Sequence, residues 1–537
     1  MGWNAALIVI GLSELLFPFR ICAQMKTCED LSTKINLAGI VIENAELVAA
    51  GSPLANSNPA MPPLPANWKF PEYCKVHGSI HARIGADNAK YAIQFELRMP
   101  NPWNGKFLFQ GGGGLDGVVQ PAMGVVGFNA PPALVRGYAV ASTDSGHQGF
   151  SNSIFGHEQQ ARLDYAYNAI GEVARAAKAV LSTYYGKSEE HSYFAGCSNG
   201  GREAMMAVER YPLEFDGAIA GDPGFNLSHA AIGEAWDTET FAAIAPRGED
   251  GRPILSKAFS QADLDLVRKA VLDECDGLDG VKDGEINNFK ECNFNPGILL
   301  CGGVKTADCL SKEQVDALRR SFSGARDSSG RQIYASWPYD AGIAGTDWRG
   351  WKLGSSTNST PNAVNTTMGA IALKDYFVHP YLADFDPAHV EFDKISGEVE
   401  ETHAINDAVS TDLGTFAKRG GKLIVYEGLS DPVFSANDIV AYFDQLATDN
   451  GGQQNAQSIA RLFLIPGMNH CGGGPSTDQF DALDALEKWV EAGKPPASIL
   501  ASGRAFPHRT RPLCPYPKFA FYKGSGDPEE AANFVCK

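Results

Sequence analysis

A short glycine-rich segment with a serine at its centre limits the possible folds of this chain more than any other feature. Residues 193–206 read YFAGCSNGGREAMM: an apolar run, then Gly196-Cys197-Ser198-Asn199-Gly200, then a helical run. So tight a reversal from strand to helix strains the serine backbone, and the glycines on either side remove Cβ atoms that would clash. The pattern predicts a nucleophile elbow. An ordinary glycine-rich turn is the alternative, because the chain holds 57 glycines.

Strand and helix patterns alternate on both sides of this segment. We expect strands at 91–99, 106–110, 137–142, 215–220, 421–426 and 461–466, and helices at 164–184, 438–446 and 478–492. Such alternation predicts an α/β fold with a parallel sheet. Between about 225 and 411 the alternation stops and loops dominate. The sequence therefore predicts a core made of residues 25–224 and 412–537, interrupted by a lid domain at 225–411.

The N-terminus and the cysteines suggest export. Residues 5–19 are mostly apolar and Cys22-Ala23-Gln24 follows, so we expect residues 1–24 to be a signal peptide; a buried helix is the alternative. Ten of the 11 cysteines lie beyond it, and an even number in an exported chain suggests disulfides and a secreted or periplasmic protein. The net charge of −18 argues against nucleic acid or an anionic membrane as partners.

Two later turns supply partners for the serine. Asp431 lies in YEGLSDP (426–432) and His470 in LIPGMNHC (464–471), each directly after an expected strand. The order Ser198, Asp431, His470 is that of α/β hydrolases, so we expect an α/β-hydrolase core. His470 would take the serine proton, and Asp431 would orient the imidazole. His147 is the alternative base, but it precedes the serine.

A run of glycines at 111–114 follows the expected strand 106–110. In α/β hydrolases such a loop supplies one oxyanion N–H, and the residue after the serine, here Asn199, supplies the other. A plain flexible loop is the alternative. Cys197 and Cys471 are adjacent to Ser198 and His470. If serine and histidine meet in space, these cysteines also come close, so we predict a Cys197–Cys471 disulfide.

The joint pattern Cys-Ser…Asp…His-Cys resembles the tannase and feruloyl esterase family over nearly the whole mature chain. The matching segments are GCSNGGRE (196–203), PGMNHCGGGP (466–475) and RPLCPYP (511–517). The resemblance implies a serine esterase acting on small aromatic carboxylic esters, with a lid over the site and Gly114 as the second oxyanion donor. It also implies four further disulfides: Cys28–Cys74, Cys275–Cys292, Cys301–Cys309 and Cys514–Cys536.

An acidic loop lies within the expected lid. Residues 275–286 read CDGLDGVKDGEI, which places three aspartates among glycines without EF-hand spacing. Calcium requires six or more oxygen ligands from a tightly turning backbone, whereas a solvated acidic turn is the alternative. The resemblance favours structural calcium. It implies carboxylate ligands from Asp276, Asp279 and Asp283 and backbone carbonyl ligands from Val281 and Glu285.

The expected substrate contacts suggest which esters are accepted. By resemblance, Trp351 and Phe434 are aromatic walls of the pocket, although core packing is the alternative for Phe434. Family members that hydrolyse a terephthalate monoester hold its carboxylate with a lid arginine, and that position matches Asn365 here. No arginine occurs between Trp351 and Tyr376, and an amide cannot replace a guanidinium at equal strength.

We therefore predict hydrolysis of feruloyl, other hydroxycinnamoyl or galloyl esters. Terephthalate-monoester hydrolysis is the first alternative, with Lys374 as a substitute cation. A non-catalytic protein that binds aromatic ligands and a serine peptidase are the others.

Overall fold

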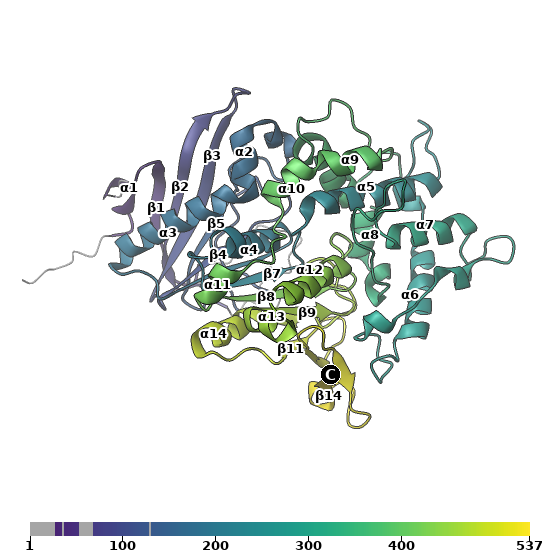
Figure 1. Ribbon diagram of the computed structural model, residues 1–537. Helices are drawn as coiled ribbons and strands as arrows, with labels where there is room; N and C mark the ends of the chain where they lie inside the picture. Colours follow the sequence, from purple (N-terminus) through teal and green to yellow (C-terminus); the bar gives the residue numbers. More distant parts are fainter. Residues whose placement is uncertain (1–26, 35–36, 53–67, 128–129) are drawn as a thin grey trace, which may run out of the picture.

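The computed structural model describes residues 27–34, 37–52, 68–127 and 130–537, so the predicted signal peptide lies outside the described residues. Within the described residues, nine strands form one mixed sheet in the order β1-β2-β3-β5-β4-β6-β7-β8-β9 (Figure 1). The pairs along β1-β2-β3-β5 are antiparallel. The pairs along β5-β4-β6-β7-β8-β9 are parallel. The predicted α/β fold is confirmed. The bounds are β1 Ile40–Val48, β2 Glu72–Ile84, β3 Lys90–Asn101, β4 Lys106–Gln110, β5 Ala139–Thr143, β6 His191–Cys197, β7 Gly217–Gly221, β8 Lys422–Gly428 and β9 Ala460–Ile465.

Apolar central strands and amphipathic helices explain this arrangement. Every residue of β5 and β7 is buried, as expected for parallel strands covered on both faces. The covering helices include α3 (Ala169–Tyr185), α4 (Asn199–Arg210), α12 (Ala436–Asp449) and α14 (Ala482–Ala492). Of these, α12 contains the predicted helix 438–446, and α3 and α14 end within one residue of the predicted positions.

Two predicted helices begin later than expected. The one expected from 164 opens with a π-helical turn, Asp164–Asn168, before α3. The one expected from 478 begins at Ala482, because Gln479 and Phe480 pair with β11 as strand β10. Asp481 then caps α14 by accepting a hydrogen bond from the Asp484 N–H.

The chain between β7 and β8 forms a separate group of helices, which we call the β7–β8 insertion (residues 222–421). It contains the whole segment predicted as a lid and contributes no strand to the described nine-stranded sheet. Figure 1 shows most of its helices beside the sheet. They are α5 Leu227–Ile244, α6 Gln261–Cys275, α7 Lys312–Phe322, α8 Thr346–Lys352, α9 Phe392–Glu398, α10 Glu400–Asn406, α11 Gly414–Lys418 and the π-helical turn η7 Asn365–Ala370.

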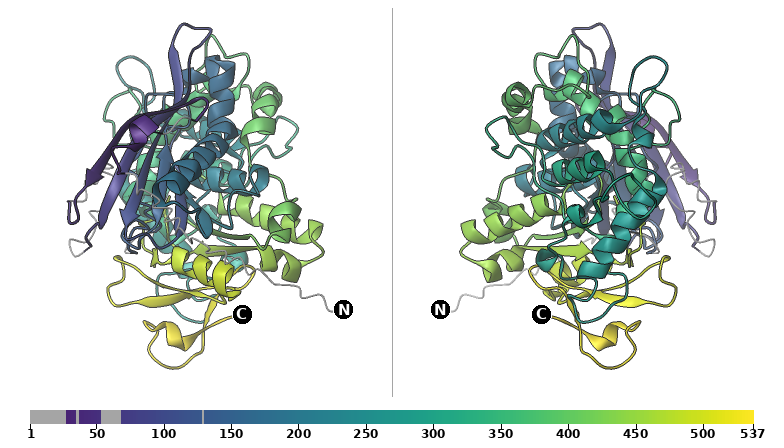
Figure 2. Two further views of the ribbon diagram at one scale, coloured as in Figure 1. Left: turned by 90° about the vertical axis from the view of Figure 1, so that its left-hand side faces the viewer. Right: turned by 90° about the vertical axis from the view of Figure 1, so that its right-hand side faces the viewer.

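The C-terminal strands β10 to β14 form two small sheets at one end of the molecule (Figure 2). Besides β10, they are β11 Ile499–Ser502, β12 Thr510–Leu513, β13 Ala520–Tyr522 and β14 Phe534–Cys536. All five predicted disulfides are present, including Cys514–Cys536 in this region. Among the described helices, none is long and apolar enough to cross a membrane.

Candidate active site

Ser198 lies at the junction of β6 and α4, in the strained backbone that an elbow requires. Its φ is 63° and its ψ is −126°, which is unfavourable for a residue with a side chain. The flanking glycines are required by close packing. A Cβ on Gly196 would lie 2.6 Å from the backbone of Gly200, and one on Gly200 would lie 2.6 Å from the Gly112 carbonyl oxygen.

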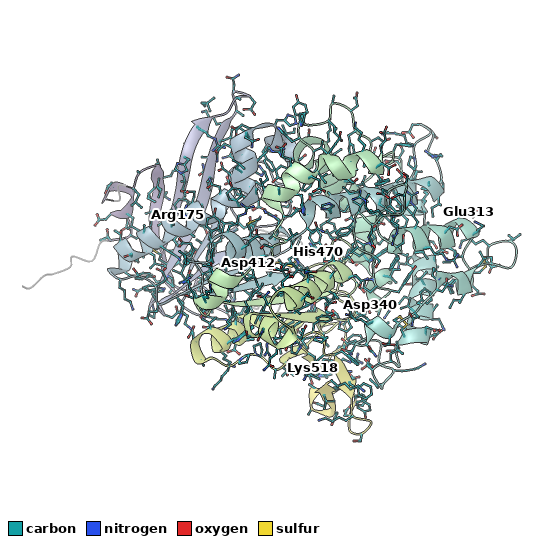
Figure 3. All side chains as sticks on the ribbon, in the orientation of Figure 1. Arg175, Glu313, Asp340, Asp412, His470 and Lys518 are labelled. Atoms are coloured by element: carbon teal, nitrogen blue, oxygen red, sulfur yellow. A yellow bond between two sulfur atoms is a disulfide. The ribbon has the colours of Figure 1, made fainter. Side chains whose placement is uncertain are left out.

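The three residues predicted to act together are in contact. Ser198 Oγ lies 2.8 Å from His470 Nε2, and His470 Nδ1 lies 2.7 Å from Asp431 Oδ2. Asp431 Oδ1 accepts hydrogen bonds from the N–H groups of Val433 and Phe434. The side chains of His470 and Asp431 are 6% and 0% exposed. Figure 3 labels His470, near the middle of the molecule.

Strand topology explains this meeting of distant residues. Ser198 follows β6, Asp431 follows β8 and His470 follows β9, and these strands belong to the parallel run β6-β7-β8-β9. Their carboxyl ends therefore lie along one edge of the sheet. With Nδ1 donating to Asp431, Nε2 is free to accept the Ser198 proton. This is the arrangement required for nucleophilic attack by serine.

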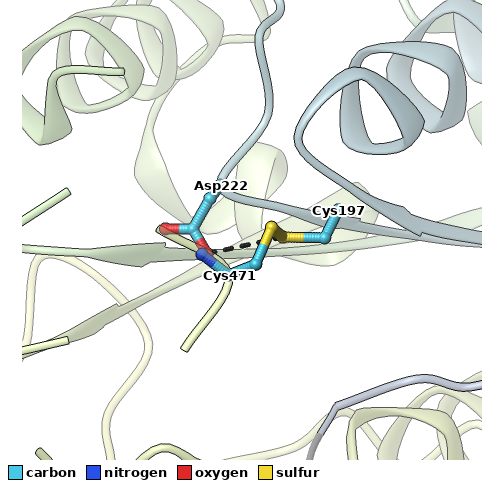
Figure 4. Close-up of side chains that lie close together, drawn as sticks. All are labelled: Cys197, Asp222 and Cys471. Atoms are coloured by element: carbon cyan, nitrogen blue, oxygen red, sulfur yellow. Dashed lines mark hydrogen bonds between the residues drawn. A yellow bond between two sulfur atoms is a disulfide. The ribbon is translucent and has the colours of Figure 1, made fainter. Parts of the chain in front are cut away.

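A disulfide joins the two turns that carry the serine and the histidine. Cys197 and Cys471 are bonded with their Cα atoms 6.0 Å apart. Asp222 lies beside them, and its Oδ2 accepts the N–H of Cys471 at 3.1 Å (Figure 4). Its Oδ1 accepts the N–H of Gly428 at 2.7 Å. Asp222 therefore connects the end of β7 to the turns after β8 and β9.

Behind Asp431 lie two more buried carboxyl groups. Oxygens of Asp222, Glu427 and Asp431 lie within 4.8 Å of one another. Burial, and then the neighbouring carboxylates, raise the pKa of both Asp222 and Glu427. Both oxygens of Glu427 also lack a hydrogen-bond partner among the described residues. Burial therefore favours the neutral forms of Asp222 and Glu427.

Hydrogen bonds connect the glycine loop after β4 to the elbow and to helix α4. The N–H of Gly112 donates to Glu203 on α4 at 2.9 Å, and buried Asp116 accepts hydrogen bonds from Asn199 and Ser145. Gly114 has a φ of +60°, and its N–H has no acceptor in the described part of the chain. Asn199 begins α4, where a helical N–H lacks an intrahelical acceptor. Asn199 is therefore part of the elbow, and Gly114 lies two residues beyond Gly112, whose carbonyl oxygen packs against Gly200.

The alternative base, His147, lies in a different setting. Its ring stacks on Phe155 with centroids 3.9 Å apart, and its Nε2 lies 2.8 Å from the Leu115 carbonyl oxygen. Burial lowers the pKa of His147 to about 4. It supports the glycine loop, whereas His470 is the histidine that contacts Ser198.

Two aromatic rings flank His470, and both had been predicted as substrate contacts. The rings of Trp351 and Phe434 lie 5.1 and 5.4 Å from the imidazole, each steeply inclined to it. Trp351 comes from the β7–β8 insertion and Phe434 from the turn after β8. Asn365 also comes from the insertion, and its Nδ2 donates to the carbonyl oxygen of Pro432 at 3.0 Å. The insertion therefore reaches the edge of the triad.

The predicted metal loop is tightly curled and acidic. Asp276 accepts the N–H groups of Asp283 and Gly284, and Asp279 accepts that of Val281. Burial, with Asp283 as a further cause, raises the pKa of Asp276 and raises that of Asp279 to about 6. Two arginines lie against the loop, since Arg511 pairs with Asp283 and Arg509 lies 3.6 Å from Glu285. Among the described residues, the loop carboxylates do not form a cluster with oxygens within 4.8 Å of one another.

Sequence reasoning missed the acidic residues behind the triad. Asp222 and Glu427 occur in no recognisable motif, because their burial depends on turns far apart in the chain. A weak signal was available: each lies at the end of an expected buried strand, where an acidic residue is unusual.

Comparisons with known proteins agree with this geometry. The crystal structure of feruloyl esterase B from Aspergillus oryzae matches with a TM-score of 0.79 at 25% identity, over 95% of this chain and 99% of that chain. The mono(2-hydroxyethyl) terephthalate hydrolase of Piscinibacter sakaiensis is 42% identical over 515 residues, covering 87% of this chain and 85% of that protein. A probable feruloyl esterase of Arthroderma benhamiae is 29% identical, covering 87% and 86%.

Fold and relatives together define a carboxylic ester hydrolase with an α/β-hydrolase fold. The profile of the family described as "Tannase and feruloyl esterase" matches residues 74–537. The chain belongs to the tannase and feruloyl esterase family.

Proposed function

We propose that this protein is a secreted or periplasmic serine esterase that hydrolyses feruloyl, other hydroxycinnamoyl or galloyl esters through an acyl-enzyme at Ser198. The observation that carries the proposal is the continuous hydrogen-bonded chain from Ser198 through His470 to Asp431. As Ser198 Oγ attacks the ester carbonyl, His470 takes its proton, and Asp431 stabilises the imidazolium. His470 then returns the proton to the leaving alcohol, and water repeats the sequence to release the acid.

The developing oxyanion would be held by the N–H groups of Gly114 and Asn199. Removing one such donor typically costs ~3 kcal/mol of transition-state stabilisation. Trp351 and Phe434 would pack against the aromatic acyl ring. The export part of the proposal is supported by the five disulfides, which form and persist in oxidising compartments.

We further propose a structural calcium ion in the loop 276–285. The donor set suits a hard cation: carboxylates from Asp276, Asp279 and Asp283, with carbonyl oxygens of Val281 and Glu285. A bound cation would draw the carboxylates together and compensate the burial and the Asp283 repulsion that raise the pKa of Asp276 and Asp279. Its role would be to hold this part of the insertion.

The alternative substrate is the terephthalate monoester that gives the Piscinibacter sakaiensis relative its name. We rank it second because Asn365 stands where a carboxylate-binding arginine is expected, and an amide holds an anion less strongly.

Active-site titration and an ester panel test the proposal. A fluorophosphonate should label wild-type protein once and leave Ser198→Ala unlabelled. Methyl ferulate, methyl caffeate and methyl gallate should be turned over faster than the terephthalate monoester, with a burst of alcohol if deacylation is slow. Absence of labelling and of turnover would leave only a binding protein, and preference for the terephthalate compound would reverse the ranking.

A further inference from the structure

A buried carboxyl group in the β7–β8 insertion lacks the hydrogen bonds that its burial demands. Glu234 on α5 is 4% exposed, and its Oε2 has no hydrogen-bond partner among the described residues. An unpaired buried oxygen is costly, so such a group in a native protein calls for an explanation. Glu234 has no place in the proposed triad chemistry.

The position of this carboxyl group depends on a glycine. A Cβ added to Gly369 would lie 1.3 Å from Glu234 Oε2, so the carboxyl occupies the space of the missing side chain. Gly369 belongs to the turn η7, four residues after Asn365. Residues four apart lie near one face of a helical turn.

Asn365 presents a second unsatisfied acceptor from the same turn. It is 1% exposed, and its Oδ1 is buried without a partner in the described residues. Its amide nitrogen is fixed, because it donates to the carbonyl oxygen of Pro432, the residue after Asp431. The amide therefore cannot rotate to offer a donor without losing that bond.

The turn that carries these groups borders the reaction centre. Met368 Sδ would lie 3.3 Å from a Cβ on Gly114, whose N–H is the proposed oxyanion donor. Pro432 connects the other side of the turn to Asp431. The turn η7, with Glu234 packed against its Gly369, thus forms a wall between Gly114 and Pro432, and the acyl ring would lie beside this wall.

The charges around this wall oppose an anion. Burial raises the pKa of Glu234; nearby Lys352 opposes this, and Asp237 and Asp431 add to it. Lys352 is already paired with buried Asp237, so it offers no free cation. A ring carboxylate placed here would meet acceptors and acidic groups. A phenolic hydroxyl could donate to the Asn365 oxygen and accept from Glu234, because burial favours the protonated carboxyl group, which carries a donor.

We propose that Glu234 and Asn365 bind a phenolic hydroxyl of the acyl ring and so select esters of hydroxylated aromatic acids. This inference rests on the proposed esterase function and names residues that would determine the substrate specificity of the esterase. Gly369 belongs to the same proposed binding site, because a side chain at this position would overlap with the Glu234 carboxyl group and displace it.

Paired substrates that differ by a single hydroxyl test the proposal. We would compare kcat/KM for methyl p-coumarate with that for methyl cinnamate, which lacks the hydroxyl. Wild-type protein should prefer the coumarate roughly 10- to 100-fold, because without the hydroxyl the buried polar groups of Asn365 and Glu234 stay unpaired. Methyl 4-methoxycinnamate, which has the oxygen but no donor, should behave like the cinnamate.

Three variants locate the effect. Glu234→Leu and Gly369→Ala should each lower kcat/KM for methyl p-coumarate and leave that for methyl cinnamate within about 3-fold. Glu234→Gln keeps a carbonyl oxygen and should retain most of the preference. Glu239→Gln is the matched control on the same helix, since Glu239 instead pairs with Arg320, and it should behave as wild type.

Each outcome has a distinct meaning. Equal wild-type kcat/KM for the two esters, or equal loss of both in Glu234→Leu and Gly369→Ala, would overturn the proposal while the esterase function stands. No turnover of any aromatic ester, together with no fluorophosphonate labelling, would instead overturn the function on which it rests.

Discussion

Asp222 is a single residue on which two turns of the active site depend. It accepts the N–H groups of Gly428 and Cys471, which lie 206 and 249 residues away in the sequence. Its own φ of 34° is unusual for a residue with a side chain. Because Asp431 and His470 are close to these two turns, their spacing depends on a side chain that takes no direct part in the proposed reaction.

Substitutions of Asp222 should separate the loss of one hydrogen-bond acceptor from the loss of both. Asp222→Asn keeps one acceptor oxygen but turns its amide NH2 toward the second backbone N–H, so kcat should fall, although less than in Asp222→Ala. Asp222→Ala leaves two buried N–H groups without acceptors, which should cost about 2–4 kcal/mol of stability and at least 100-fold in kcat. Steady-state kinetics on methyl ferulate and thermal melting measure both effects.

The control is Asp412→Ala, because Asp412 is exposed and distant from the triad in sequence. Wild-type kinetics and melting temperature in Asp222→Ala would contradict the positioning role.

Contacts between individual residues could be predicted from sequence where the residues belong to short, contiguous motifs. The contacts among Ser198, Asp431 and His470, and the disulfide between their neighbours, followed from short segments placed after expected strands. Asp222, Glu427 and Glu234 were not predictable in this way. Their environments arise from backbone groups or glycines that are remote in sequence, as Gly369 is from Glu234.

At the scale of elements, the end of β5 holds a buried acid that links two strands. Asp144 Oδ1 accepts the N–H groups of Gln94 on β3 and Gly146, both at 2.9 Å. Its Oδ2 is buried without a partner in the described residues. Burial outweighs these hydrogen bonds and raises the pKa of Asp144 to about 7.

This raised pKa makes a prediction about stability and pH. An unfolded aspartate titrates near 3.9, so between about pH 4 and 7 the folded state binds the proton more tightly. The contribution of Asp144 to stability is therefore fully present below about pH 4 and is lost as the pH rises through 7. Asp144→Asn should be more stable than wild type at pH 8.5, on the order of 2–4 kcal/mol, with no such gain at pH 4.

Thermal unfolding of both proteins at the two pH values measures this difference, with Asp412→Asn as an exposed control. The same difference in melting temperature at both pH values would refute the assignment to a titrating carboxyl group.

The acidic loop at 276–285 yields a second prediction at this scale. If it binds calcium, a chelator should lower the melting temperature by several degrees, since a ligand bound to the folded state stabilises it. Added calcium should restore the loss. Asp279→Asn should melt lower than wild type and respond less to the chelator. An unchanged wild-type melting temperature after metal removal would exclude a stabilising ion.

Elements were predicted well where periodicity was strong and poorly where tertiary pairing decides the structure. β4 has the predicted bounds, and β7, β8 and β9 lie within a few residues of them. β1 and β2 were missed, because their alternation is interrupted and β2 is held by partners on both sides. The strand β10 was taken for helix, since two residues cannot show a period.

For the whole molecule, the sheet joins parts of the chain that the insertion separates by about two hundred residues. β7 and β8 pair residue for residue from Gly217 with Lys422 to Gly221 with Tyr426. The Cys197–Cys471 bond, with a sequence separation of 274, closes the same large loop at the active site.

Removing this bond should be more damaging than removing a short-range one. The chain-entropy model gives about 5 kcal/mol for a loop of this length and about 2.5 kcal/mol for the loop closed by Cys301–Cys309. The double variant C197A/C471A should therefore show the larger fall in melting temperature and also lose kcat. The variant C301A/C309A is the matched control and should keep kcat. Equal effects on both quantities would contradict this view.

We expect the same bond to determine when the protein becomes active. A chain still in a reducing compartment lacks the covalent tie between nucleophile and base, so its catalytic machinery is unfinished. We expect newly made chains to be harmless to ester metabolites of the producing cell and to mature only after thiol oxidation elsewhere.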